Sequence, residues 1–214
     1  MKTKVLILVL IILSSLFLFY FFKQKPQNDV LTTFVESPFI YNFDKEELFE
    51  EAGRMEDSKN SYWWLNSGGL FYTENGTGNT IQGKLPFYSP WRIRYSKSNP
   101  TDTEEGYQPQ NIFRLLTRSK WQNFQQEVFF KIIADNLSKS PNRNESNGVL
   151  LFNRYKDGDN LYYVGLRVDG AAVIKKKIKG VYHTIAYKKY FSTNLLPKNK
   201  WVGIRSETQN TPEG

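Results

Sequence analysis

The chain has 214 residues, of which 16% are aromatic, and it contains no cysteine and a single histidine, His183. Disulfide frameworks, thiolate zinc sites, cysteine nucleophiles and multi-histidine metal centres are therefore excluded. The formal net charge is +8, and residues 139–205 hold 14 basic but only four acidic side chains. This basic half favours anionic partners in general, although a solvated, lysine-rich sheet surface explains it equally well.

Residues 5–22 form an apolar run without a single charge. As a helix rising about 1.5 Å per residue, this run spans about 27 Å, close to the roughly 30 Å of a bilayer core. A cleaved signal peptide is the competing interpretation, but aromatic residues run directly into Lys23 and leave no small residues for cleavage. The pattern therefore predicts a retained transmembrane helix.

We expect three segments: a signal anchor at residues 1–25, a linker at 26–40 and one domain at 41–214. Lys2 and Lys4, together with the amino terminus, give a small excess of positive charge before the apolar run. That excess places the N-terminus inside. The domain is then extracytoplasmic, the protein is a single-pass protein of the cell membrane, and the membrane is the partner of its N-terminal helix.

The aromatic content favours strands, because flat or branched side chains suit a half-buried sheet surface. Asp44–Gly53 fits either one or two helical turns or the acidic opening strand of a sandwich. Tyr62–Leu65 and Leu70–Tyr72 are short apolar runs with turn residues between them, which indicates strand, turn and strand. Residues 91–95, where Arg92 and Arg94 alternate with apolar residues, fit an amphipathic strand, or an aromatic cluster able to stack on sugars or bind a phosphate.

The stretch from Gly148 to Tyr187 is the most regular part of the sequence. Apolar runs are separated there by Asp157–Asn160, Asp169–Gly170 and Lys179–Gly180, each of which contains a glycine. Glycine supplies the positive φ that tight turns need. The pattern predicts a four-stranded antiparallel meander with strands at 148–156, 161–168, 172–178 and 181–187.

A four-residue first loop sets a register for this meander, with Arg154 opposite Tyr163 and Leu151 opposite Leu166. The period of two then predicts that one face forms the core and that Val181, His183 and Ile185 also point inward. The predicted core residues of the first two strands are Val149, Leu151, Val164, Leu166 and Val168. A three-residue loop at 169–171 keeps Lys175 and Lys177 on the opposite face, beside Gly165 and Tyr163.

The run Gly148–Tyr163, with its Asp157–Asn160 turn, resembles the strand, turn and strand signature of concanavalin A-like, laminin G-type jelly-roll domains. The resemblance continues through Ile174–Lys177 to Trp201–Arg205, and upstream Trp121–Ile132 is similar to the strand before this hairpin. It implies an all-β antiparallel jelly-roll sandwich over about residues 60–205. Such domains continue with further strands after Trp201–Arg205, so the resemblance implies a sandwich that is incomplete here.

Catalytic chemistry finds little support in the sequence. Retaining glycosidases of this fold need paired carboxylates on one strand face, and no strand here has that spacing. A lyase acting on acidic glycans is the alternative, with Tyr182 as base and Arg167 or Lys175 as the neutralising cation. Asp157–Asn160 offers oxygens for calcium, but a turn explains those residues fully and a calcium site needs more ligands. We therefore expect no cofactor, with calcium as the alternative.

The leading functional hypothesis is a non-enzymatic carbohydrate-binding or adhesion module that recognises a polysaccharide or glycan, above all an anionic one. A purely structural surface domain is the third hypothesis, and nucleic acid is not expected as a partner of an anchored extracytoplasmic domain. The residues predicted to bind carbohydrate are Arg154, Tyr163, Arg167, Lys175, Lys177 and Tyr182. Arg167 is expected to hold a sugar carboxylate with two hydrogen bonds while Tyr163 stacks on the sugar ring.

Overall fold

A computed structural model describes residues 37–81, 83–134, 139–141, 147–190 and 196–212. The predicted anchor at 1–25 and most of the linker at 26–40 lie outside these residues and stay predictions. In the ranges that are described, no helix is long and apolar enough to cross a membrane.

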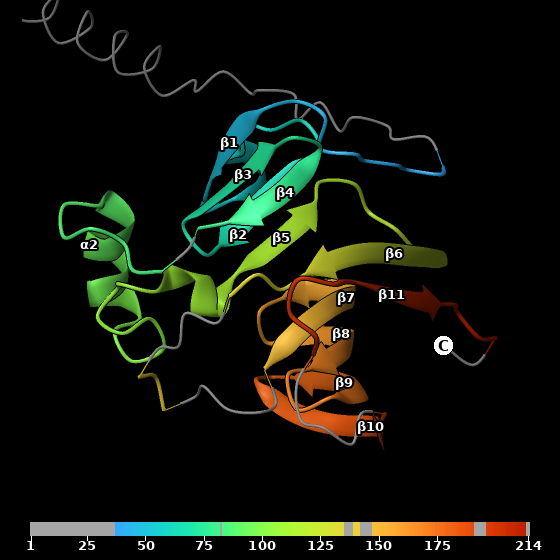
Figure 1. Ribbon diagram of the computed structural model, residues 1–214. Helices are drawn as coiled ribbons and strands as arrows, with labels where there is room; N and C mark the ends of the chain where they lie inside the picture. The colour runs from blue at the N-terminus through green and yellow to red at the C-terminus, as the bar shows by residue number, and fades with distance from the viewer. Residues whose placement is uncertain (1–36, 82, 135–138, 142–146, 191–195, 213–214) are drawn as a thin grey trace, which may run out of the picture. The chain divides into compact units, whose positions relative to one another are not determined.

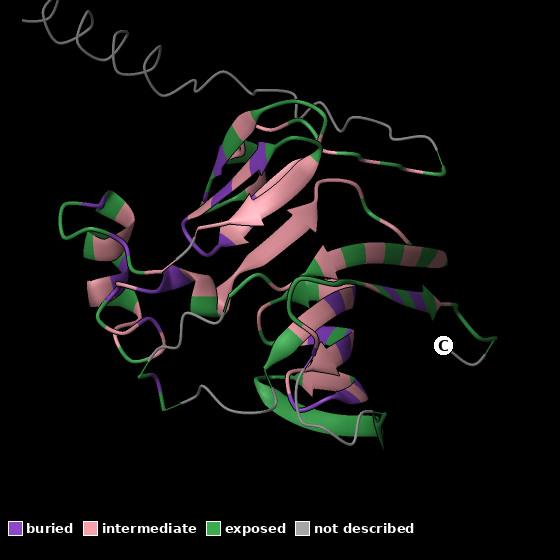
Figure 2. Cartoon of the chain, viewed as in Figure 1, coloured by how far each residue is buried: buried purple, intermediate pink, exposed green. Residues whose placement is uncertain are grey.

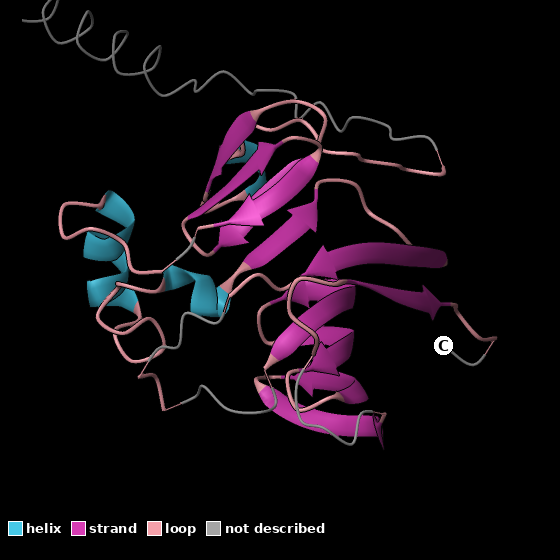
Figure 3. Cartoon of the chain, viewed as in Figure 1, coloured by secondary structure: helices cyan, strands magenta, loops and turns pink. Residues whose placement is uncertain are grey.

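The described chain is dominated by antiparallel strands (Figures 1 and 3), which confirms the all-β expectation at this level. The strands are β1 (Glu47–Glu50), β2 (Trp63–Ser67), β3 (Leu70–Glu74), β4 (Thr77–Thr80), β5 (Arg114–Thr117), β6 (Phe124–Lys131), β7 (Gly148–Asp157), β8 (Asn160–Arg167), β9 (Ala171–Ile178), β10 (Val181–Lys189) and β11 (Trp201–Thr208). The helical elements are α2 (Pro90–Ser98) and the short 3₁₀ helices η1 (Met55–Asp57) and η2 (Pro109–Ile112). The jelly-roll arrangement itself remains a proposal.

The N-terminal strands form two small sheets around an aromatic core. The first sheet has the order β1-β3-β4, and β2 pairs with β5 in the second. Phe49, Leu65 and Phe71 are buried together, and Phe43, Trp63, Phe113 and Leu115 pack against them. The acidic opening segment is thus a strand, β1, in which Phe49 is buried in the core while Leu48 and Glu50 are exposed.

Residues 90–98 are a helix, so the predicted strand at 91–95 is wrong. Ser89 is the N-cap, with its hydroxyl accepting from the Arg92 N–H, and Pro90 occupies the first turn. Both residue types favour a helix start, because proline has no N–H to leave unsatisfied and serine satisfies one that is left. Tyr95 is the buried side chain of α2, and it fixes the helix against the N-terminal strands.

The predicted four-stranded meander is confirmed, with the sheet order β10-β9-β8-β7. The register differs from the prediction by two residues: Phe152, not Arg154, lies opposite Tyr163, and Leu151 lies opposite Val164. An irregularity between Asn153 and Asp157 causes the shift. Because a shift of two residues preserves the alternation of faces, the side of the sheet that each remaining residue occupies is unchanged.

The assignment of core and surface in this sheet needs correction. Leu161, Tyr163 and Val173, on the face predicted to be outward, form a buried cluster with Leu150, Phe152 and Tyr155 packed against it. On the opposite face Leu151 is buried, but Val149, Val164 and Leu166 are only half-buried.

Strand β10 is exposed along its whole length (Figure 2), so the inward placement of Val181, His183 and Ile185 is wrong. It is the edge strand of the meander, and neither of its faces is covered by another described element. A register shift between Thr184 and Ala186 interrupts its pairing with β9. Such bulges blunt an edge strand against uncontrolled pairing with other chains.

Strands β6 and β11 pair side by side (Figure 1), and this pair joins the meander through polar side chains. Asn153, buried in β7, accepts hydrogen bonds on Oδ1 from Gln126 Nε2 at 3.0 Å and from the Thr208 hydroxyl at 2.8 Å. Gln126 also donates to the Phe152 carbonyl at 2.7 Å. A buried polar group costs free energy unless it is paired, and here the pairing fixes β7 against β6 and β11.

Candidate functional site

The residues predicted to bind carbohydrate fall largely on one side of the meander, which we call the basic face. It comprises Tyr163 and Arg167 of β8, Lys175 and Lys177 of β9, and Tyr182 of β10. Tyr163 lies opposite Lys175, and Lys177 lies opposite Tyr182. Lys175 was predicted beside Gly165 and Lys177 beside Tyr163, so the register along β8 differs from the prediction by two residues. The lysines still share a face with Tyr163, as expected.

Arg167 is already engaged by a neighbouring carboxylate. Its Nε donates to Asp169 Oδ1 at 3.1 Å and its Nη2 donates to Asp169 Oδ2 at 2.8 Å, with both side chains largely buried. The guanidinium also lies 5.5 Å from the centre of the Tyr187 ring. Because Asp169 occupies both prongs of the guanidinium, Arg167 holds the 167–171 turn and is poorly available to a sugar carboxylate.

Lys177 is also engaged, whereas Lys175 is not. The Lys177 ammonium donates to the Gly158 carbonyl at 2.9 Å, pairs with Asp159 at 3.0 Å and lies 4.9 Å from the Tyr182 ring centre. The Lys175 ammonium has no hydrogen bond or ion pair to any described residue. Lys175 is therefore the cation of this face that is available to a ligand.

The two tyrosines of the basic face differ in exposure. Tyr163 is 8% exposed, and its burial, with a smaller contribution from Tyr182, raises the pKa of its hydroxyl. Tyr182 is 58% exposed and meets Tyr163 edge-on at 6.4 Å between ring centres. Of these two rings, a ligand can therefore reach Tyr182, and the buried Tyr163 ring packs against it.

Arg154 lies outside the basic face, contrary to the predicted register. It sits in the β7 irregularity with a positive φ of 51°, and its guanidinium donates to the Asn210 side chain. Tyr187, which was not predicted as a site residue, is 52% exposed and joins the face next to Arg167. The β10 bulge at Ile185 moves Tyr187 to this side, and no residue type at that position signals it.

The carboxylate oxygens of the Asp157–Asn160 turn are already engaged in hydrogen bonds and an ion pair within the protein. Asp157 Oδ1 accepts the Asp159 N–H at 2.8 Å and the Asn160 Nδ2 at 2.9 Å, and these hydrogen bonds lower the pKa of Asp157, the Asn160 side chain most strongly. Asp159 pairs with Lys177. Across the described ranges, no group of three or more His, Asp or Glu side chains is arranged to hold a metal ion. Calcium binding by the turn stays a prediction.

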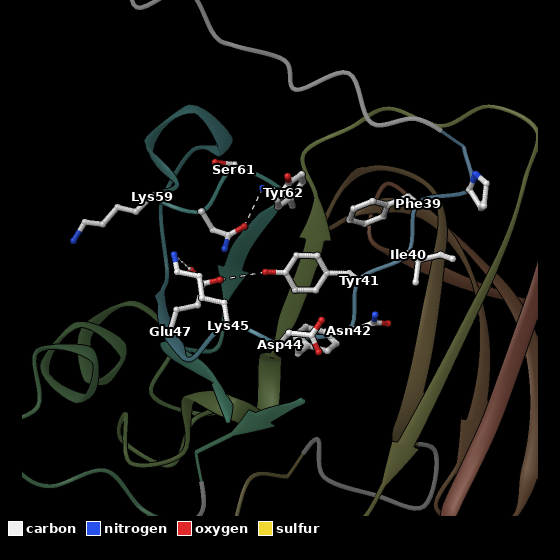
Figure 4. A pocket seen from close by; sticks show the side chains of 13 residues that line it. Phe39, Ile40, Tyr41, Asn42, Asp44, Lys45, Glu47, Lys59, Ser61 and Tyr62 are labelled. Atoms are coloured by element: carbon white, nitrogen blue, oxygen red, sulfur yellow. Dashed lines mark hydrogen bonds and ion pairs between the residues drawn. The ribbon is translucent and has the colours of Figure 1, made fainter. Parts of the chain in front are cut away.

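A second candidate is an open cleft of about 620 Å³ in the N-terminal half (Figure 4). Two segments line it, residues 38–47 and 59–62, and it contains both aromatic rings and polar side chains. Residues 38–40 were placed in the linker from the sequence. No residue of this cleft was predicted as a ligand contact, because nothing in the sequence shows that the two segments meet.

Comparison with known proteins adds no relative. No family model, curated protein or solved structure matches the chain. The concanavalin A-like assignment therefore remains a proposal, and function has to be argued from the surface chemistry of this chain alone.

Proposed function

We propose that the chain is a membrane-anchored, extracytoplasmic carbohydrate-binding or adhesion module that recognises an acidic glycan on its basic face. The observation that supports this most directly is Lys175, an ammonium without a partner among the described residues, in register with Tyr163 and on the same face as exposed Tyr182. A cation beside an accessible ring is the combination that a negatively charged sugar requires.

Each group has a separate task in this proposal. Lys175 contacts the carboxylate or sulfate of the glycan, and the exposed rings of Tyr182 and Tyr187 contact the apolar faces of successive sugar units. Arg167 and Lys177 do not contact the glycan directly in this proposal. Their ion pairs with Asp169 and Asp159 hold the turns at the ends of the basic face. The edge position of β10 leaves the site open along the strand, as a polymer requires.

The first experiment compares Lys175→Ala with Lys176→Ala, using polygalacturonate and chondroitin sulfate as probes. Lys176 lies opposite Tyr162, on the other face, so it is a neighbour with the same charge in the wrong place. We expect Lys175→Ala to weaken binding about tenfold, the scale of a lost hydrogen bond to a charged group. The full-length protein is measured by calorimetry in a sugar-free detergent, so that no glycoside competes.

The two outcomes of this test separate the hypotheses. Equal losses for Lys175→Ala and Lys176→Ala would leave only a diffuse charge effect, and no binding of either polymer would leave the structural surface domain. The lyase alternative makes its own signal, because eliminating a uronate creates an unsaturated product that absorbs in the ultraviolet. Accumulation of that product, abolished by Tyr182→Phe, would replace binding with catalysis.

A further inference from the structure

The cleft beside β1 and β2 is built from rings on one side. Phe39, Tyr41 and Tyr62 surround each other, with 5.9 Å between the Phe39 and Tyr62 centres and 5.7 Å between Tyr41 and Tyr62. Trp63 and Phe43 stack behind them at 6.1 Å and connect the rings to the buried core. Tyr62 is 39% exposed, so its ring contributes an accessible surface that the core holds in place.

The other side of the cleft is polar. The Tyr41 hydroxyl donates to Glu47 Oε1 at 3.2 Å (Figure 4), and the Lys45 ammonium lies 3.7 Å from Glu47 Oε2. The Glu47 side chain is 21% exposed, so it is partly accessible to a ligand. Burial raises the pKa of Tyr41, and the neighbouring Glu47 carboxylate raises it further. The Tyr41 hydroxyl therefore stays protonated and donates a hydrogen bond to Glu47, which lines the cleft.

The charges that line the cleft balance. Asp44 and Glu47 are acidic, Lys45 and Lys59 are basic, and Lys59 is paired with Glu50 at 3.2 Å. An acidic ligand therefore has no electrostatic advantage here, in contrast to the basic face. The lining also includes the amides of Asn42 and Asn60, and Asn60 Oδ1 is already occupied by the N–H groups of Tyr62 and Trp63.

We propose that this cleft is a separate binding site for an uncharged saccharide. Its volume of about 620 Å³ lies within the roughly 300–1,000 Å³ that is usual for small-molecule sites. The apolar face of a sugar ring packs on Tyr62 and Phe39, and sugar hydroxyls donate to Glu47 and Asp44, since carboxylates accept such hydrogen bonds strongly. Nothing in this proposal requires the basic face to bind a glycan.

The test uses the full-length protein in a sugar-free zwitterionic detergent, with cellotriose, maltotriose and chitotriose as probes. Binding is followed by calorimetry and by quenching of tryptophan fluorescence, because Trp63 lies directly behind the rings. We expect at least one trisaccharide to bind saturably. Glu47→Gln should weaken it about tenfold or more, as for loss of a charged acceptor, and Tyr62→Ala by a similar factor.

Glu74→Gln is the matched control, because Glu74 is an exposed carboxylate of β3 in the same sheet and does not line the cleft. It should leave saccharide affinity unchanged, and so should Lys175→Ala, which belongs to the basic face. Glu47→Gln preserves the size of the side chain, so it tests the site even where Tyr62→Ala fails to fold. No saturable binding of any probe, or equal effects of Glu47→Gln and Glu74→Gln, would overturn the proposal.

Discussion

Glu51 shows how single side chains fix the N-terminal half. Its buried carboxylate accepts hydrogen bonds from the Tyr95 hydroxyl and from the Gly69 N–H at 3.0 Å, and it pairs with Arg94 at 2.9 Å. The Tyr95 oxygen in turn accepts the Gly68 N–H at 3.2 Å. A buried charge is tolerated only when its oxygens are satisfied in this way, so the network joins α2 to the β2–β3 turn. Its members are all paired, which argues for a structural role.

Tyr95→Phe should therefore destabilise the fold by about 1–3 kcal/mol, because one donor to Glu51 is lost and the Gly68 N–H is left unpaired. Chemical denaturation measures the difference. Tyr88→Phe is the control: Tyr88 is 70% exposed, and its hydroxyl makes no hydrogen bond to a described residue. Equal stability of Tyr95→Phe and the unmodified protein would contradict the network.

Tyr95 also makes the stability of the folded state depend on pH. Burial, with the Glu51 hydrogen bond, raises the pKa of Tyr95 above its ordinary value, so the folded state keeps this proton to higher pH than the unfolded state. The resulting stability is fully present below about pH 10, the ordinary tyrosine pKa, and is lost as pH rises above it. Denaturation midpoints between pH 8 and 11 should fall more steeply for the unmodified protein than for Tyr95→Phe.

At the scale of elements, local turn chemistry made the meander predictable. Glycine at each turn and apolar runs of strand length fixed the order β10-β9-β8-β7, and the period of two placed Tyr163, Lys175 and Tyr182 on one face despite a register error. The error came from the irregularity after Asn153, which has no residue signature. Residues 91–95 were expected to form a strand because Arg92 and Arg94 alternate with apolar residues, whereas the N-cap Ser89 and Pro90 in the first turn favour the helix α2.

Long-range contacts account for what the sequence could not predict. The cleft depends on residues 38–47 meeting residues 59–62, and the occupation of Arg167 by Asp169 depends on the shape of a turn. The exposure of β10 depends on the absence of a covering element among the described residues. Periodicity reports which side of a strand a residue occupies, but not what packs there.

Helix α2 also depends on one glycine contact. Gly106 has a φ of +79°, and a Cβ added there would lie 2.1 Å from the Arg92 carbonyl oxygen and 2.7 Å from the Ser96 nitrogen. Gly106→Ala should therefore push the 103–106 turn away from α2 and cost at least about 2 kcal/mol. Gly53→Ala is the control, because a Cβ there meets nothing within 4 Å. Thermal unfolding that shifts equally in both variants would refute this packing.

At the scale of the whole described chain, one side chain links its two halves. Asn66 Oδ1, in β2, accepts hydrogen bonds from Arg114 Nε at 2.9 Å and from the Tyr155 hydroxyl of β7 at 3.4 Å. The N-terminal sheets carry the cleft with its balanced charges, and the meander carries the basic face. The excess positive charge of residues 139–205 therefore lies in the half that carries the basic face, and not in the half that carries the cleft.

This separation predicts different salt dependences for the two ligands. Binding of polygalacturonate releases counterions from a polyanion, so its affinity should fall about tenfold between roughly 50 and 200 mM salt, as expected for a small number of cation contacts. Binding of a neutral trisaccharide to the cleft should change less than about twofold, because its hydrogen bonds and ring contacts involve no ion exchange. Calorimetric titrations at the two salt concentrations measure both affinities, and Lys175→Ala should flatten only the first dependence. A salt-insensitive polygalacturonate complex would show that the basic face is not its binding site.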